Sequence, residues 1–325
     1  MCLTNSGAWI PTVSGRGLIT SFPSRSVSQV CLQSFSAMQN TQRYTQSMQT
    51  PCSQFSCLLH LHAVVCVMCF AQGRAGYVAQ GSNYARDNAK APLFTYVNED
   101  KLKGIKTYLH FMNLLDNYEV STGVSETVTS EEQKENMLFI DSIMETNVMK
   151  CAHKYLVRKG QSQSDPGQFK KQLYDIWFRL YHRDRSGGED SCGFEHVFVG
   201  ETKFDREIMG LHNWIQFYLQ EKHNHIDYKG YKARQGKDTP DEDDHVLNLQ
   251  FSWKGLVKAI GGSFIGVSPE FEMALFTIIF LMSTEKRTSV VVKVDEYVLE
   301  LVVYRHRGSI GTSYPTLLSS NHRDL

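Results

Sequence analysis

The hydrophobic pattern of this chain changes at Gly187-Gly188, and that change limits the possible fold more than any other feature. From about residue 98 to residue 182, apolar residues recur at steps of three and four, as on the buried faces of helices. After the glycine pair, runs such as Leu247 to Trp253 alternate apolar and polar residues, which indicates half-buried strands. No crossover helix separates the last strands, so antiparallel pairing is expected. The prediction is an α+β fold, with a helical N-terminal half packed with a mixed, largely antiparallel β-containing C-terminal half.

Local signals mark where several of the helices begin and end. An apolar stripe from Leu102 to Leu115 predicts the first helix. Thr129 and Glu132 have the spacing of a capping box. A helix from about residue 149 to residue 159 is expected to stop at Gly160, a residue that often follows a helix C-terminus. Asp165-Pro166 and Ser268-Pro269 each combine a capping residue with proline in the first turn, and so predict two further helix starts.

The first 75 residues differ in composition from the rest of the chain. They are rich in Ser, Gln and Thr, no Asp or Glu precedes Asp87, and six of the eight cysteines lie within the first 69 residues. We interpret residues 1–75 as a non-globular extension. Residues 76–325 are interpreted as one domain, divided into a helical half, 76–186, and a mixed α+β half, 187–325.

A short apolar run at residues 57–71 lies within this extension. It is shorter than the roughly 20 residues of a membrane-spanning helix and ends in small and polar residues. This pattern is typical of a secretory signal peptide, and its position would suit one if translation began at Met48. Secretion is therefore expected, without stable membrane association. The alternative is an organellar transit peptide, because the segment carries Arg and Ser but no acidic residue.

The charge of the chain excludes a general nucleic-acid coat. From Asp87 onward there are 29 basic and 34 acidic residues, a net charge of −5. Contact with RNA would therefore be confined to a cleft or assisted by a cation. Only Cys151 and Cys192 lie in this part, so the domain is not a disulfide scaffold.

The stretch from Gly193 to Trp214 contains the strongest candidates for chemistry. Phe194, His196 and Phe198 alternate with other residues, which predicts a strand with His196 on one face. His212 stands just before a helical stripe that begins at Trp214, close to the helix N-terminus, where backbone N–H groups attract phosphate. Two such histidines could flank a phosphodiester as general base and general acid. The alternative is that each is an ordinary packed or surface histidine.

Several longer motifs resemble the EndoU family of uridylate-specific (poly(U)-specific) endoribonucleases. They occur in order from about Ala91 to Pro315, so the resemblance covers roughly the last three quarters of the chain. The motifs are Leu114 to Tyr118, Gln172 to Phe178, Gly193 to Glu201, Gly210 to Trp214, Asn224 to Tyr231, Leu249 to Gly255, Ile265 to Glu272 and Gly311 to Pro315.

The resemblance implies a catalytic group of His196, His212 and Lys258. Lys258 follows from the family pattern Trp-x-Gly-x-x-Lys, and Lys254 is the competing lysine. By analogy with the coronavirus relative, His212 would act as base and His196 as acid. The 2′-hydroxyl of RNA would then attack the neighbouring phosphate, and the product would carry a 2′,3′-cyclic phosphate.

The family pattern also implies supporting roles for two carboxylates. Glu195 and Glu201 would orient the histidines or bind the activating metal, and the family is typically manganese-dependent. If they had no such role, they would be solvated carboxylates at a strand edge. Asp241 to His245 offers oxygen ligands that suit Mn²⁺, although an exposed acidic loop is the simpler interpretation. His223 and His225 are interpreted as surface residues.

Selection of uridine is expected from a turn at Thr312, Ser313 and Tyr314. A hydroxyl and a backbone amide can bind the pyrimidine edge, and a tyrosine ring can stack on base or ribose. Relatives often have serine four residues after the catalytic lysine, whereas this chain has Gly262 there and Ser263 next. The expected partner is single-stranded, U-containing RNA, bound by a monomer.

Two other functions remain open from the sequence. One is a non-catalytic RNA-binding or secreted interaction protein on the same fold. The other is a metal-dependent phosphodiesterase in which the glutamates and histidines of the Gly193 to Trp214 stretch ligate the ion directly.

Overall fold

The computed structural model describes residues 68–70, 87, 89, 91–183, 188–231, 245–294 and 297–320. Of the predicted features, residues 1–67 and 71–75 of the extension and Asp241 to Asp244 lie outside the described residues. Within the apolar run, residues 68–70 form a short strand, β1, that pairs antiparallel with β2 (Phe94–Val97). Among the described residues, no helix is both long enough and apolar enough to cross a membrane.

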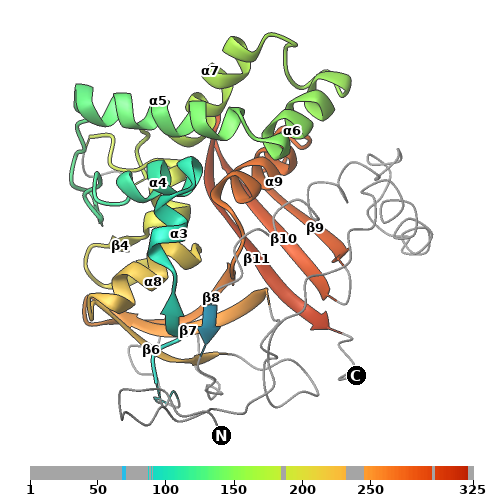
Figure 1. Ribbon diagram of the computed structural model, residues 1–325. Helices are drawn as coiled ribbons and strands as arrows, with labels where there is room; N and C mark the ends of the chain where they lie inside the picture. Colours follow the sequence, from blue (N-terminus) through green and yellow to red (C-terminus); the bar gives the residue numbers. More distant parts are fainter. Residues whose placement is uncertain are drawn as a thin grey trace, which may run out of the picture.

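The helices of the first half gather at one end of the molecule, and the strands of the second half extend away from them (Figure 1). The α-helices are α3 (Glu99–Lys103), α4 (Lys106–Asn113), α5 (Ser130–Met144), α6 (Asn147–Arg158), α7 (Pro166–Trp177), α8 (Trp214–Lys222) and α9 (Pro269–Leu281).

Helix boundaries follow the capping residues read from the sequence. Thr129 caps α5 with a reciprocal pair of hydrogen bonds to Glu132, so the predicted capping box is confirmed. Asp165 caps α7, and proline occupies the first turn of both α7 and α9, but the Ser268 side chain makes no capping hydrogen bond to α9. The caps at Thr129 and Asp165 were predicted correctly because they depend on local backbone groups that need a partner wherever the helix packs.

The first predicted helix is wrong in detail. The chain breaks at Gly104-Ile105 into α3 and α4, because Ile105 is extended at the start of α4. The break rotates the buried face of α4 toward Tyr108 and Phe111, and Leu109 is left 37% exposed. When a helix is interrupted, the three-and-four spacing of apolar residues no longer continues in register. Counting through the break therefore assigns the wrong buried face to the second helix.

The β-strands form small, mainly antiparallel sheets. Three strands are ordered β6-β7-β8, three are ordered β11-β10-β9, and the β3-β4-β5 sheet contains one parallel pair, β3 with β4. The strands are β2 (Phe94–Val97), β3 (Ser121–Thr122), β4 (Glu201–Lys203), β5 (Glu207–Met209), β6 (Ile226–Tyr231), β7 (Val246–Trp253), β8 (Leu256–Phe264), β9 (Arg287–Val294), β10 (Tyr297–His306) and β11 (Ser309–Ser320).

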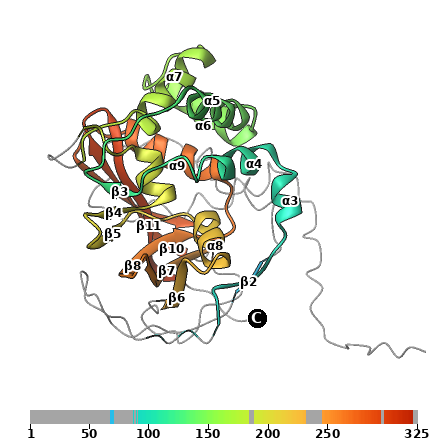
Figure 2. The same ribbon diagram turned by 90° about the vertical axis from the view of Figure 1, so that its left-hand side faces the viewer.

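Helix α9 joins the two halves, although it follows β8 in the chain. It packs against α4 and α6 on one side and against β9 and β10 on the other (Figures 1 and 2). The indole nitrogen of Trp177 in α7 donates to the Thr277 hydroxyl of α9 at 2.9 Å. One continuous hydrophobic core therefore extends through helices and sheets, which agrees with the predicted α+β architecture.

Candidate active site

His196 lies in a turn of π-helix, Glu195–Val199, and the predicted strand is wrong. The Gly200 amide donates to the Glu195 carbonyl at 2.8 Å, five residues back. Phe194 and Phe198 lie 5.1 Å apart and both pack on Phe111, at the core. Residues four apart share a side in a strand and in a helix, so the phenylalanine spacing could not separate the two structures. Single π-turns are rare and often mark functional sites.

His212 lies at the start of α8, as predicted. The Asn213 side chain caps this helix by accepting the backbone N–H groups of Ile215 and Gln216 at 3.0 and 3.1 Å. The preceding Gly210 has a positive φ of 62°, and a side-chain carbon there would lie 1.6 Å from the His196 carbonyl oxygen. Glycine is therefore required, because the two histidine-bearing segments touch at this point.

Backbone hydrogen bonds hold the two histidine segments together. The Leu211 amide donates to the His196 carbonyl at 3.1 Å, and the His212 amide donates to the Val197 carbonyl at 2.8 Å. The side chains of His196 and His212 are therefore brought together although their residues lie in different elements. Both histidines are buried, with 6% and 7% of their surface exposed.

The two imidazoles are anchored through the same atom to different partners. Nδ1 of His196 is 2.6 Å from Oε2 of Glu201, whereas Nδ1 of His212 is 2.8 Å from the Gly262 carbonyl oxygen. A carbonyl can only accept a hydrogen bond, so Nδ1 of His212 carries a proton and its Nε2 holds the lone pair in the neutral ring. The anchoring leaves Nε2 of both rings for a substrate.

Lys258 on β8 supplies positive charge beside both rings. Burial lowers the pKa of Lys258 to about 8, while Glu207 acts in the opposite direction. The pKa of His196 falls to about 4, through burial first and then through Arg183, with Lys258 adding to it. Burial and then Lys258 bring the pKa of His212 well below its usual value.

The competing lysine lies elsewhere. Lys254 is exposed in the turn between β7 and β8, with its amine 5.5 Å from the centre of the Trp253 ring. Of the two lysines, Lys258 is therefore the one whose charge reaches the histidines, in agreement with the family pattern.

Glu201 is held as a carboxylate by two partners. Burial alone would raise its pKa, but His196 and Arg183 outweigh burial, and the pKa lies below its usual value. The Arg183 Nε is 3.0 Å from Glu201 Oε2 and 2.9 Å from the Ser191 hydroxyl, and a terminal nitrogen donates to the Gly311 carbonyl at 2.8 Å. Sequence reasoning missed Arg183, because no local pattern separates it from other basic residues.

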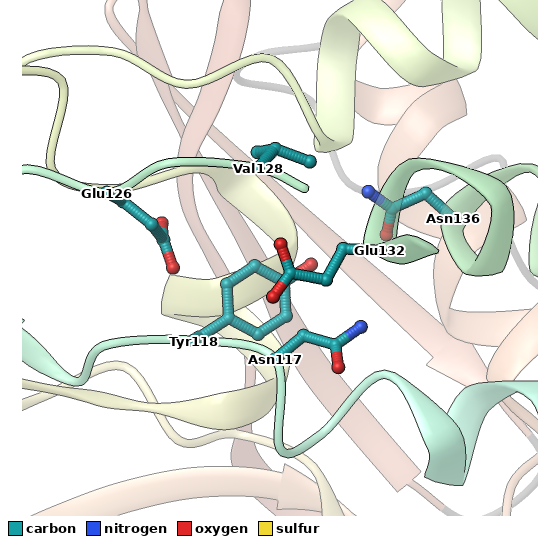
Figure 3. A pocket seen from close by; sticks show the side chains of 6 residues that line it. All are labelled: Asn117, Tyr118, Glu126, Val128, Glu132 and Asn136. Carbon is teal, nitrogen blue, oxygen red and sulfur yellow. The ribbon is translucent and has the colours of Figure 1, made fainter. Parts of the chain in front are cut away.

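Glu195 is in a different state from Glu201. Its side chain is fully buried, both carboxyl oxygens are without a hydrogen-bond partner, and burial raises its pKa well above the usual value. Burial also raises the pKa of nearby Glu126, to about 7. Glu126 and Tyr118 line a small pocket on the helical half (Figure 3), and neither histidine takes part in it.

The predicted uridine-binding turn is part of a strand. Thr312, Ser313 and Tyr314 belong to β11 and pair with β10, so the prediction of a turn is wrong. Gly311 and Pro315 looked like turn residues, but β11 lies at the edge of its sheet, where proline is tolerated. Tyr314 stacks on His212 with ring centres 5.0 Å apart, whereas Ser313 is fully buried.

Gly262 stands four residues after Lys258, and strand β11 leaves no room for a side chain there. A side-chain carbon at Gly262 would lie 1.9 Å from the Pro315 carbonyl oxygen. The next residue, Ser263, is buried, and its hydroxyl donates to the His212 carbonyl at 2.8 Å. This serine therefore supports His212 and is not directed at a base.

The described residues do not fit a manganese site. None of the described His, Cys, Asp and Glu side chains form a group of three that could hold a metal ion. The carboxylate of Glu201 is already bound by His196 and by the guanidinium of Arg183, which supplies the positive charge there. His223 and His225 are exposed beyond the end of α8, as predicted from the sequence.

Comparison with known proteins shows consistent relatives. The sequence model described as Endoribonuclease XendoU matches residues 69–315. The uridylate-specific endoribonuclease C of Danio rerio is 67% identical over 254 residues, covering 78% of this chain and 82% of that protein. The poly(U)-specific endoribonuclease of Xenopus tropicalis is 63% identical, covering 78% and 87%.

A solved structure agrees with these relatives. It is described as the structure of XendoU, a splicing-independent snoRNA-processing endoribonuclease. It matches with a TM-score of 0.73 and 55% identity, covering 82% of this chain and 97% of that one. With the fold, the paired histidines and the family match all in agreement, this chain belongs to the XendoU family of endoribonucleases.

Proposed function

We propose that this protein is an endoribonuclease that cleaves single-stranded RNA at uridylates by attack of the ribose 2′-hydroxyl on the adjacent phosphate. One observation carries the proposal. Two neighbouring imidazoles are held by Nδ1 and present Nε2, and the charge of Lys258 reaches both. Base, acid and a cation for the crowded phosphorane are what this cleavage requires.

The different anchors suit different roles for the two histidines. His212 is neutral, with its lone pair on Nε2, and would take the proton from the 2′-hydroxyl. His196 has the carboxylate of Glu201 at its back, which stabilises an imidazolium, and would protonate the departing 5′-oxygen. A bound phosphate adds negative charge that offsets Lys258 and Arg183, and so raises the pKa of both rings in the complex.

The nucleophile would come from the RNA. Of the residues beside the His196 segment, Cys192 is 1% exposed, and burial raises the pKa of its thiol well above the usual value. Ser191 is fully buried and bound to Arg183. Neither is available as a protein nucleophile, whereas the 2′-hydroxyl needs only a base.

Uridine would be bound on the exposed side of β11. Thr312 and Tyr314 are partly exposed and lie two residues apart, on the same face of the strand. The Tyr314 ring already stacks on His212, so a base placed against it lies beside the proposed general base. Ser313 would contribute through its backbone, since its side chain is buried.

The chemistry is tested by a substrate whose single uridine carries 2′-deoxyribose. This RNA should bind but remain intact, and the matching all-ribose RNA should give a 2′,3′-cyclic phosphate. Cleavage at the deoxyuridine would assign water as the nucleophile and favour a metal-dependent phosphodiesterase. Binding of both substrates without cleavage of either would favour a non-catalytic RNA-binding protein.

Manganese, secretion and a monomeric state also belong to this proposal. Since the described residues do not fit a metal site, we propose that Mn²⁺ acts by binding the RNA. The melting temperature of the protein alone should then be unchanged by MnCl₂, and a rise would place a site on the protein.

Secretion rests on the apolar run at residues 57–71, with an intracellular protein as the alternative. N-terminal sequencing of the mature protein and sedimentation analysis test the last two.

A further inference from the structure

A tight turn beside the site displays an aromatic side chain to solvent. The turn joins β4 to β5 and consists of Lys203, Phe204, Asp205 and Arg206, with the Arg206 amide donating to the Lys203 carbonyl at 2.9 Å. Phe204 and Asp205, its two central residues, have positive φ angles of 48° and 52°. These signs are those of a type I′ turn, which strongly prefers asparagine, aspartate or glycine at its centre.

Phenylalanine is therefore a costly choice at this position. A bulky side chain in the left-handed region is strained by about 1–2 kcal/mol, and such strain gathers at functional positions. The turn is held in place by Asp205, whose carboxylate accepts the Thr202 hydroxyl at 3.0 Å and the Ser121 hydroxyl at 3.3 Å. The Phe204 side chain is only partly buried in return, because 46% of its surface remains exposed.

The turn lies close to the catalytic group. Strand β4 begins at Glu201, the partner of His196, and β5 leads to the segment that carries His212. In the register of the two strands, the backbone of Lys203 lies opposite that of Glu207. The charge of Glu207 acts on Lys258. Strand β5 packs against β8, and Figure 2 shows the two side by side. The turn that carries Phe204 therefore lies on the Lys258 side of the site.

The charges around Phe204 suit a nucleic acid strand. Lys203 and Arg206, on either side of the central pair, are exposed, and neither forms a salt bridge with another described residue. The acidic residue between them, Asp205, is engaged by two hydroxyl groups. An aromatic ring flanked by cations is the arrangement with which proteins bind single strands, by stacking on a base and neutralising its phosphates.

We propose that Phe204 is a stacking platform for an unpaired base flanking the cleaved uridylate, with Lys203 and Arg206 binding the phosphates of that nucleotide. The proposal rests on the function proposed above and adds a second subsite, outside the nucleotide that is cut. It implies that the enzyme distinguishes longer single strands from a minimal substrate.

The test compares Phe204→Asn with the unchanged protein on two substrates. One is a uridine 3′-phosphate ester with a 4-nitrophenyl leaving group, which has no flanking nucleotide, and the other is an oligonucleotide with a single uridine between adenosines. Because a stacked base contributes about 1–3 kcal/mol, kcat/KM on the oligonucleotide should fall roughly 10-fold, mainly through KM. Activity on the 4-nitrophenyl ester should be unchanged. Asparagine favours the turn, so the melting temperature should not fall, and Phe204→Trp should restore the oligonucleotide activity.

A binding experiment separates this subsite from the chemistry. Oligonucleotides with 2′-deoxyuridine at the cleavage position and 2-aminopurine on its 5′ or 3′ side should lose fluorescence on binding, and Phe204→Asn should remove that loss on one side. Tyr96→Asn, which removes an aromatic ring that is 53% exposed on β2, is the matched control and should leave it intact. Equal KM values and equal quenching for Phe204→Asn and the unchanged protein would overturn the subsite. If the unchanged protein cut neither substrate, the proposed function would fail, while the quenching would still decide the subsite.

Discussion

The segments around His196 and His212 carry the same side chain in opposite surroundings. His196 lies in a π-turn and hydrogen-bonds to a carboxylate that Arg183 also binds. His212 lies before a helix and hydrogen-bonds to a backbone carbonyl, with Tyr314 stacked on its ring. A carboxylate stabilises the charged ring, whereas a carbonyl selects a tautomer with less gain for the charge. The partner of Nδ1 therefore decides which histidine holds a proton more readily.

The largest expected effects come from removing either ring. His196→Ala and His212→Ala should each lower turnover by at least about 100-fold, because each removes a general acid or base. A uridine 3′-phosphate ester with a 4-nitrophenyl leaving group needs no acid. On this substrate the defect of His196→Ala should shrink, while that of His212→Ala should persist. The opposite pattern would exchange the roles of the two histidines.

The next largest effect is expected from Lys258, whose charge acts on both imidazole rings. Lys258→Ala should lower kcat by about 100-fold, the scale seen when one stabilising donor is removed from a transition state. The matched variant, Lys254→Ala, removes an exposed lysine beside Trp253 and should be close to unchanged. Steady-state kinetics on a uridine-containing oligonucleotide measure both. A greater loss for Lys254→Ala would overturn the placement of the catalytic lysine.

A smaller effect is expected from changing the partner of His196 alone. Glu201→Gln removes the negative charge behind the ring, and a fall of one pKa unit would lower its protonated fraction about tenfold. The part of the pH–rate profile where activity falls as His196 loses its proton should shift to lower pH, with the titration of His212 unaffected. Glu221→Gln alters another buried carboxylate, which binds the Leu93 and Phe94 amides away from the site, and serves as the control. A shift of the profile in both variants would show that the effect is structural.

The smallest effect concerns the pH dependence of the free energy of unfolding, which Glu272 behind the His212 segment is expected to change. Glu272 in α9 accepts the Asn213 side-chain N–H at 2.8 Å, and burial raises the pKa of Glu272 to about 8. The folded protein then holds a proton that the unfolded chain releases near pH 4.5, so the stability contribution falls as pH rises from 4.5 to 8. Glu272→Gln keeps an acceptor and removes this titration. Chemical denaturation across that range should show a shallower decline, with kcat unchanged at pH 7. An equally steep decline would assign the pH dependence to other groups.

Several elements with signals inside one turn were predicted correctly, whereas two elements that depend on long-range contact were not. The capping box at Thr129 and the start of α8 after His212 depend on residues within one turn, so their sequences are sufficient. The π-turn at His196 depends on Phe111, which lies 83 positions away from Phe194, and on the contact with Gly210. The strand at Tyr314 depends on pairing with β10.

By itself the sequence determined the α+β class, several helix ends, and a candidate group of His196, His212 and Lys258. These depend on periodicity, capping and motifs, which are properties of neighbouring residues. Only the tertiary structure decided what each catalytic candidate touches, including the missed Arg183 and the different partners of the two Nδ1 atoms. Burial and nearby charge set the protonation state of a side chain, and both arise from residues distant in sequence that folding brings within a few ångströms.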